Sequence, residues 1–217
     1  MIASTVLFGS GVAAADEDLA KKLAAYEIEA RSIGTDLPHP NQTSHASGMR
    51  KLVDAEVAYA TGDYDTAALM LFDLVGKPGA DQEPARYYLA ESLFQKGDRG
   101  AARGYFADLV SSGNVSSKFY QPSLQRLVEL SILQTDDSDV AKWFQALDAI
   151  NPGLREASVP YVHGKYAFAK EKLDEALAYF EAVPKGSSFE LQALYYTGTT
   201  YVAKSDLAKA TDVFADL

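Results

Sequence analysis

The stretch Ala55–Leu74, AEVAYATGDYDTAALMLFDL, decides the fold because it returns twice later in the chain in altered form. Gly164–Val183 reads GKYAFAKEKLDEALAYFEAV, and Gly198–Leu217 reads GTTYVAKSDLAKATDVFADL. Each copy begins with a small residue, reaches a turn seven residues later and then resumes with an apolar stripe. This pattern predicts a helix, a tight turn and a second helix in every copy.

Five such units follow one another when the chain is aligned on a small or apolar anchor residue, with spacings of 35, 38, 36 and 34 residues. The anchors are Ala67, Ala102, Val140, Ala176 and Ala210. Four residues after them stand Leu71, Phe106, Phe144, Phe180 and Phe214, and twelve before them stand Ala55, Ala90, Val128, Gly164 and Gly198. The turns are expected to start at Gly62, Gly97, Thr135, Glu171 and Ser205. Such a period is typical of arrays of helical hairpins, in which the small residues allow two helices to approach closely.

These recurring stretches resemble the tetratricopeptide repeat family over residues 48–217. The third unit, Ser123–Pro152, departs from the pattern because Val128 and Val140 replace small residues. The resemblance implies an all-α solenoid of α-α hairpins, wound into a right-handed superhelix with about five units. Helices of this kind bury their apolar faces by stacking on neighbouring hairpins.

In this family the first helix of each hairpin lines a concave groove, and the resemblance implies which residues of this chain point into it. One row is Leu52, Tyr87, Gln125, Tyr161 and Tyr195, and a second is Tyr59, Phe94, Ile132, Phe168 and Val202. Between them runs a third row of Glu56, Glu91, Glu129, Lys165 and Thr199. We therefore expect a groove with an aromatic floor and an acidic N-terminal half.

Aromatic side chains on a rigid curved scaffold suit the capture of a peptide or helix, because large apolar anchors dominate binding energy. The alternative is that these rings pack between hairpins and stiffen the array. Chaperone-binding members of the family grip a C-terminal carboxylate with Lys, Arg and Asn. The equivalent rows here carry Tyr and Glu, which argues against that clamp.

The first residues point to export. Ile2–Val12 is apolar or small, and three alanines before Asp16 fit the site that signal peptidase accepts. We interpret residues 1–15 as the remainder of a secretory signal and expect a periplasmic protein; no Lys or Arg precedes the apolar run, as if the true start lay upstream. The alternative is a loosely packed first helix. An amphipathic helix over Asp18–Ile33 and a linker ending at Gly48 follow, so residues 16–47 precede the repeats.

Composition excludes several classes of function. The chain of 217 residues has a net charge of −10 and no basic run, which argues against a nucleic-acid partner. It has no cysteine, so disulfides, thiol catalysis and zinc sites of the Cys type are excluded. The apolar N-terminal run falls short of the roughly 20 residues that a bilayer requires, so no stable membrane span is expected after signal cleavage.

Catalytic and metal chemistry are not expected either, and no cofactor is predicted. His39, His45 and His163 are too scattered for a metal triad, and His163 is predicted to be packed on a helix. Asp136, Asp137 and Asp139 lack the Gly and distal Glu of a calcium loop, so a turn with a helix cap is favoured. No carboxylate is placed with a nucleophile motif or a His partner.

The sequence thus predicts a non-enzymatic scaffold that binds a partner protein or peptide in its groove. The alternatives are an N-terminal module of a larger envelope enzyme and a structural subunit that binds through the edges of the solenoid. The last helix carries Leu207, Ala210, Val213, Phe214 and Leu217, an apolar face without the polar cap of a finished array. We expect this last hairpin to be truncated, or covered by another subunit.

Overall fold

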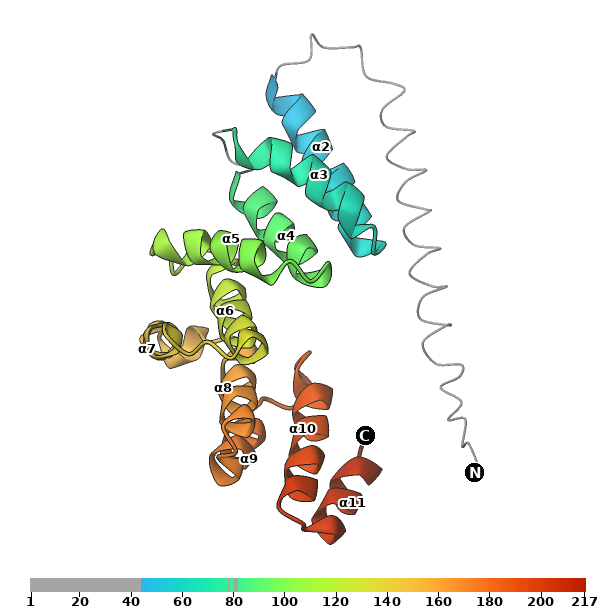
Figure 1. Cartoon of the computed structure of the whole chain (residues 1–217), viewed down its shortest axis with the longest axis vertical. Coiled ribbons are helices and arrows are strands. Elements are labelled where there is room, and N and C mark those ends of the chain that lie inside the picture. Colours follow the sequence, from blue (N-terminus) through green and yellow to red (C-terminus); the bar gives the residue numbers. More distant parts are fainter. Residues whose placement is uncertain (1–43, 78, 80–81) are drawn as a thin grey trace, which may run out of the picture. The chain divides into compact units, whose positions relative to one another are not determined.

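The computed structural model describes residues 44–77, 79 and 82–217 (Figure 1). The chain divides into two units, Met1–Ser47 and Gly48–Leu217, and the repeats lie in the second. The described residues form ten α-helices and a short 3-10 helix, with no strand among them. The all-α class is therefore confirmed, whereas the tetratricopeptide superhelix remains a prediction. The proposed signal remnant, the predicted helix over Asp18–Ile33, and His39 lie outside the described residues.

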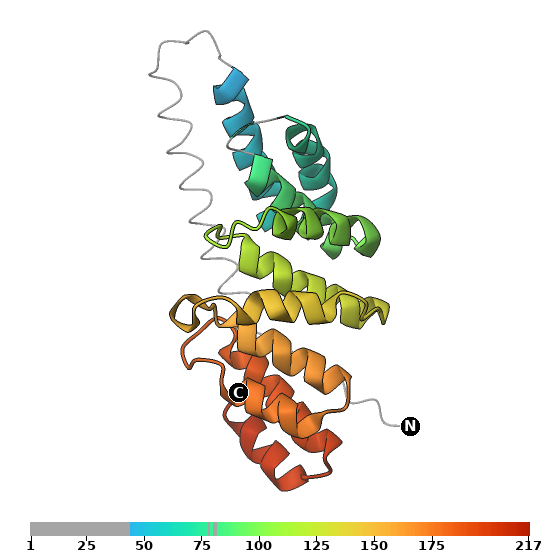
Figure 2. The same cartoon turned by 90° about the vertical axis from the view of Figure 1, so that its left-hand side faces the viewer.

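The helices follow one another as pairs joined by short turns. Their bounds are α2 Ser44–Ala60, α3 Tyr64–Val75, α4 Gln82–Gln95, α5 Arg99–Ser111, α6 Tyr120–Gln134, α7 Val140–Asp148, the 3-10 helix Pro152–Leu154, α8 Ser158–Ala169, α9 Leu173–Glu181, α10 Glu190–Ala203 and α11 Leu207–Ala215. Within the second unit, most helices pack on their neighbours in sequence, and α6 also packs directly on α8 (Figure 2). None of the described helices is long and apolar enough to cross a bilayer.

The helix α2 starts earlier than the sequence predicts. Residues 44–48 are helical, although the predicted linker runs to Gly48. Ser44 is a residue type favoured at helix starts, and the apolar stripe of α2 begins only at Leu52. The helix therefore begins about two turns before its buried stripe.

Each turn within a pair contains one residue in the left-handed conformation, and these five residues are the predicted turn starts. Gly62 and Gly97 have φ of 82° and 83°, a region that glycine enters without steric cost. Thr135, Glu171 and Ser205 have φ of 55°, 58° and 61° at the equivalent positions. The same backbone turn is therefore built with and without glycine.

Aspartate side chains begin the second helix in three of the pairs. The carboxylate of Asp63 accepts a hydrogen bond from the backbone N–H of Thr66 at 3.1 Å, and Asp98 accepts one from Ala101 at 3.2 Å. Asp206 accepts one from Lys209 at 3.3 Å. Each bond satisfies a donor that the first helical turn leaves without a partner.

The predicted close approach of paired helices is confirmed at the two repeat glycines. A Cβ atom added to Gly164 would lie 2.5 Å from Cε1 of Phe180, and one added to Gly198 would lie 2.5 Å from Cε1 of Phe214. Real Cβ contacts are not this short, so no larger residue fits without movement of the ring. In both pairs the glycine of the first helix thus makes room for the phenylalanine ring of the second helix.

The degenerate third unit keeps a full core. Leu124, Leu127 and Val128 of α6 are completely buried, together with Leu147 of α7. Trp143 on α7 is also buried, and the guanidinium carbon of Arg103 lies 5.0 Å from the centre of its ring. Arg103 also pairs with Asp136 at 3.1 Å, and Lys170 pairs with Asp137, so cations of the chain itself engage this acidic turn.

Candidate functional site

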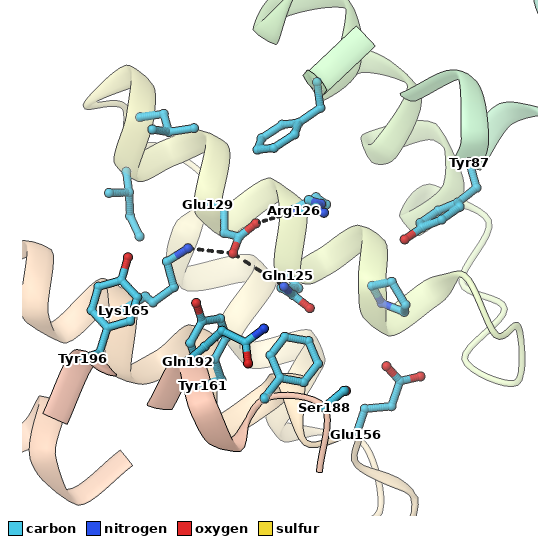
Figure 3. A pocket seen from close by; sticks show the side chains of 15 residues that line it. Tyr87, Gln125, Arg126, Glu129, Glu156, Tyr161, Lys165, Ser188, Gln192 and Tyr196 are labelled. Carbon is cyan, nitrogen blue, oxygen red and sulfur yellow. Dashed lines mark hydrogen bonds and ion pairs between the residues drawn. The ribbon is translucent and has the colours of Figure 1, made fainter. Parts of the chain in front are cut away.

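A pocket of about 720 Å³ lies among α4, α6, α8 and α10, which are the first helices of four successive pairs (Figure 3). We call it the central pocket. It is lined by Tyr87, Phe94, Pro122, Gln125, Arg126, Glu129, Ile132, Leu133, Glu156, Tyr161, Lys165, Ser188, Phe189, Gln192 and Tyr196. Its volume is in the range of sites that hold small ligands or short peptide segments.

Arg126 of α6 joins the pocket to α4 through a two-pronged ion pair. Its Nε donates to Oε1 of Glu91 at 2.7 Å and its Nη2 donates to Oε2 at 3.0 Å. Glu91 is almost completely buried, and the hydroxyl of Tyr59 donates to its Oε2 at 3.3 Å. A buried carboxylate of this kind needs both a cation and hydrogen bonds to remain charged.

Glu129 continues the chain of charges toward α8. Its Oε2 accepts from Nη1 of Arg126 at 2.6 Å, and its Oε1 accepts from Nζ of Lys165 at 2.8 Å (Figure 3). Burial raises the pKa of Glu129, but Lys165 and Arg126 outweigh it and the net pKa is lowered. We call Glu91, Arg126, Glu129 and Lys165 the charge ladder; it contains two cations and two anions.

Aromatic rings enclose the two cations. The guanidinium carbon of Arg126 lies 4.7 Å from the ring centre of Phe94. The ammonium nitrogen of Lys165 lies 5.4 Å from the ring of Tyr161 and 5.8 Å from that of Tyr196. The negative faces of these rings attract the cations, which fixes the rotamers of both long side chains.

The phenols of the pocket are hydrogen-bond donors and not bases. Burial, together with Glu91, raises the pKa of Tyr59 to about 12 and that of Tyr87 still further. Burial also raises the pKa of Tyr161, with a further contribution from Tyr196. All three hydroxyls therefore keep their protons at neutral pH, and general-base chemistry by a tyrosinate is not available there.

No protein-family model matches the chain, and no curated protein sequence matches it. The function must therefore be inferred from the geometry of the described residues.

Seven of the fifteen residues in the three predicted rows line the central pocket: Tyr87, Phe94, Gln125, Glu129, Ile132, Tyr161 and Lys165. Tyr59 and Glu91 belong to the hydrogen-bonded network beneath it. Leu52 is buried in the core with Ala55 and Leu71, so it cannot offer a groove surface.

The other five residues of the rows, Glu56, Phe168, Tyr195, Thr199 and Val202, do not line the pocket. Glu56 is on α2; burial raises its pKa, and the attraction of Lys118 only partly offsets this. Phe168 packs with its ring centre 5.8 Å from that of Tyr196. Tyr195 is 55% exposed and lies beside Phe214 on α10 and α11.

The prediction of an acidic N-terminal half of the groove is wrong for two of its three glutamates. Glu91 and Glu129 are paired with Arg126 and Lys165, which cancel their charges. The sequence rows missed this because Arg126 is one position away from the predicted row, and one residue of an α-helix turns the side chain by about 100°. A usable signal was the spacing of three residues between Arg126 and Glu129, which favours a helical ion pair.

The missed residues of the pocket include Tyr196, Phe189, Gln192 and Glu156. Tyr196 follows directly after the predicted Tyr195, so the same phase error explains it. Phe189 and Glu156 precede their helices, where a helical repeat gives no information about direction. Such residues are found only when the loops between pairs are placed.

The remaining candidate for chemistry is His163. Its imidazole is buried and stacked between Phe144 and Tyr179, with ring centres 4.1 Å and 4.8 Å away. This confirms a packed histidine. Nε2 lies 3.5 Å from Oδ1 of Asp148, but the adjoining cavity of about 340 Å³ is lined by no Ser, Thr or Lys. The described residues contain no group of three metal-ligating side chains.

Proposed function

We propose that the chain is an exported, non-enzymatic scaffold of the tetratricopeptide type, which binds an extended segment of a partner protein in the central pocket. The observation that carries this proposal is a pocket lined from four successive first helices by five aromatic rings around a charge-balanced floor. Recognition sites of this kind hold a ligand by apolar anchors and orient it by a few polar groups.

Support for the repeat type comes from the local structure. The left-handed turn residue recurs in all five pairs, and the close glycine–phenylalanine contact recurs in the last two. Support for export comes from the sequence alone, through the apolar run and alanines of residues 1–15.

Binding is favoured over catalysis because the charged groups of the ladder are already paired with one another. The ion pairs of the charge ladder have short, well-formed hydrogen bonds, and Tyr87 and Tyr161 keep their protons because burial raises their pKa. A catalytic acid or base needs a pKa near neutrality, whereas the pKa of Glu129 is shifted away from it. The pocket therefore offers a fixed surface.

Two adjacent tyrosines provide the test. Tyr196 lines the pocket, whereas Tyr195 is exposed outside it, so Tyr195→Ala is a matched control for Tyr196→Ala. The full chain and both variants would be immobilised and exposed to an extract of the native envelope. We expect Tyr196→Ala to lose the captured protein, since a buried aromatic anchor contributes about 2 kcal/mol or more. Equal capture by both variants would assign binding to another surface, such as the edge of the array.

A further inference from the structure

The charge of the central pocket is not evenly distributed. Both cations that line it, Arg126 and Lys165, are bonded to carboxylates of the ladder. Glu156 also lines the pocket and has no ion-pair partner among the described residues. With Glu91 counted beneath the floor, three carboxylates face two cations, and the uncompensated charge is on Glu156.

Glu156 lies at one end of the pocket, on the same side as Ser188 and away from Lys165 (Figure 3). Its neighbour Arg155 is directed elsewhere, because its guanidinium donates to the backbone carbonyls of Ile150, at 3.0 Å, and Asp148. Burial raises the pKa of Glu156, and the neighbouring Ser158 only partly opposes this. A cation brought to this carboxylate would relieve its desolvation.

An anionic ligand has no comparable place. Beside Arg126 or Lys165 it would lie close to Glu91 or Glu129, whose negative charges already balance these cations and would repel it. The amide of Gln192, the hydroxyl of Ser188 and the amide oxygen of Gln125, whose Nε2 already donates to Glu129, can instead pair with the N–H and C=O groups of an extended backbone.

We propose that the central pocket selects a peptide segment with an apolar or aromatic side chain against Phe189 and Tyr196 and a Lys or Arg beside Glu156. This inference rests on the proposed function and adds the chemistry of the ligand to it. The pocket thereby discriminates against acidic segments and free carboxylate ends, since like charges next to Glu156 are repelled.

The test uses acetylated and amidated nonapeptides with one Phe in a Ser/Ala background. A single Lys, Gln or Glu is placed in turn at each of the remaining positions of the peptide. Binding of each peptide to the full chain is measured by titration calorimetry. We expect the best Lys peptide to bind about twofold to fivefold more tightly than its Gln counterpart, as for a partly exposed ion pair. The Glu counterpart should bind most weakly.

Variants of the protein assign the preference to one residue. Glu156→Gln should bring the ratio of Lys to Gln affinities close to one, while Glu181→Gln, an exposed carboxylate outside the pocket, should leave it unchanged. A Lys preference that persists in Glu156→Gln, or a preference for Glu, overturns the inference. If no peptide binds, or if Tyr196→Ala binds as the wild type does, the proposed function itself is overturned.

Discussion

The pairs α8–α9 and α10–α11 carry the same residues at equivalent positions but bury them to different extents. Gly164 contacts Phe180 as closely as Gly198 contacts Phe214. Yet Phe180 is 3% exposed and Phe214 is 39% exposed. Because α10 packs on α8 and α9, it covers the first pair, and no described helix covers the second. The repeat sequence sets the local crossing, and the next pair decides whether that crossing is buried.

The third predicted row, from Glu56 to Thr199, also differs between the covered pairs and the last pair. In the middle of the array it holds Glu129 and Lys165, which are tied together within the charge ladder. In the last pair it holds Thr199, whose hydroxyl donates to the backbone carbonyl of Tyr195 at 2.8 Å. A charged side chain that neighbouring helices cover needs an opposite charge from those helices, whereas a hydroxyl can bond to the backbone of its own helix.

The largest expected loss of stability comes from removing Arg126 from the charge ladder. Arg126→Ala should destabilise the protein by about 3 to 5 kcal/mol, because it leaves the buried Glu91 without a cation and the buried Glu129 with Lys165 alone. Unfolding in urea, followed by circular dichroism, measures this. The control is Lys204→Ala in the last pair, which removes an ion pair to the exposed Asp174 of α9 and should leave the midpoint nearly unchanged. Similar losses in both variants would remove the distinction between covered and open pairs.

The glycine crossings sharpen the comparison directly. Gly164→Leu should cost about 1 to 3 kcal/mol, because Phe180 is enclosed and its ring cannot move away. Gly198→Leu should cost clearly less, since the partly exposed Phe214 has solvent to turn into. Thermal melting of the two variants tests this order. A larger loss in Gly198→Leu would show that burial of the ring does not control the response.

A smaller effect on stability is expected from the protonation of His163, a histidine that has no counterpart in the last pair. Burial lowers its pKa from the ordinary value of 6.5, and the opposing attraction of Asp148 does not restore it. Stability is therefore fully present above about pH 6.5 and is lost as the pH falls through the lowered pKa, because the unfolded chain takes up the proton first. The urea midpoint should fall between pH 7.5 and pH 5.5 in the wild type and fall less in His163→Phe. Parallel profiles would exclude His163 as the source.

The smallest effect concerns the turns. Thr135→Gly should stabilise the protein by about 0.5 to 1 kcal/mol, since the strain of a β-branched residue at φ 55° exceeds the entropy that glycine loses on folding. Ser205→Gly, in the last pair, should stabilise the protein less, because serine is not β-branched and is less strained at a positive φ. Differences in melting temperature between the two variants measure this, and a loss on Thr135→Gly would mean that its side chain contributes a compensating interaction.

The sequence predicted those features that depend on neighbours within one hairpin. The turn residues and the close approach of the helices at Gly164 and Gly198 follow from spacings along a single pair of helices. Features that join different pairs were missed or wrong. Arg126 meets Glu91 across 35 residues, and Tyr196 faces the pocket in place of Tyr195. An error of one residue in helical phase is small in sequence but turns the side chain to another face.

The burial of Trp143 has a consequence for how unfolding is observed. It is the only tryptophan of the chain, it belongs to the core shared by α4 to α8, and Arg103 lies over its ring. Its fluorescence emission therefore reports loss of the central core and is insensitive to separation of α10 and α11, whereas the far-ultraviolet signal of the helices reports both. Emission and ellipticity curves coincide only if the array unfolds as one cooperative unit. A last pair that opens first would displace the ellipticity curve to lower denaturant, while the emission stays that of an enclosed indole.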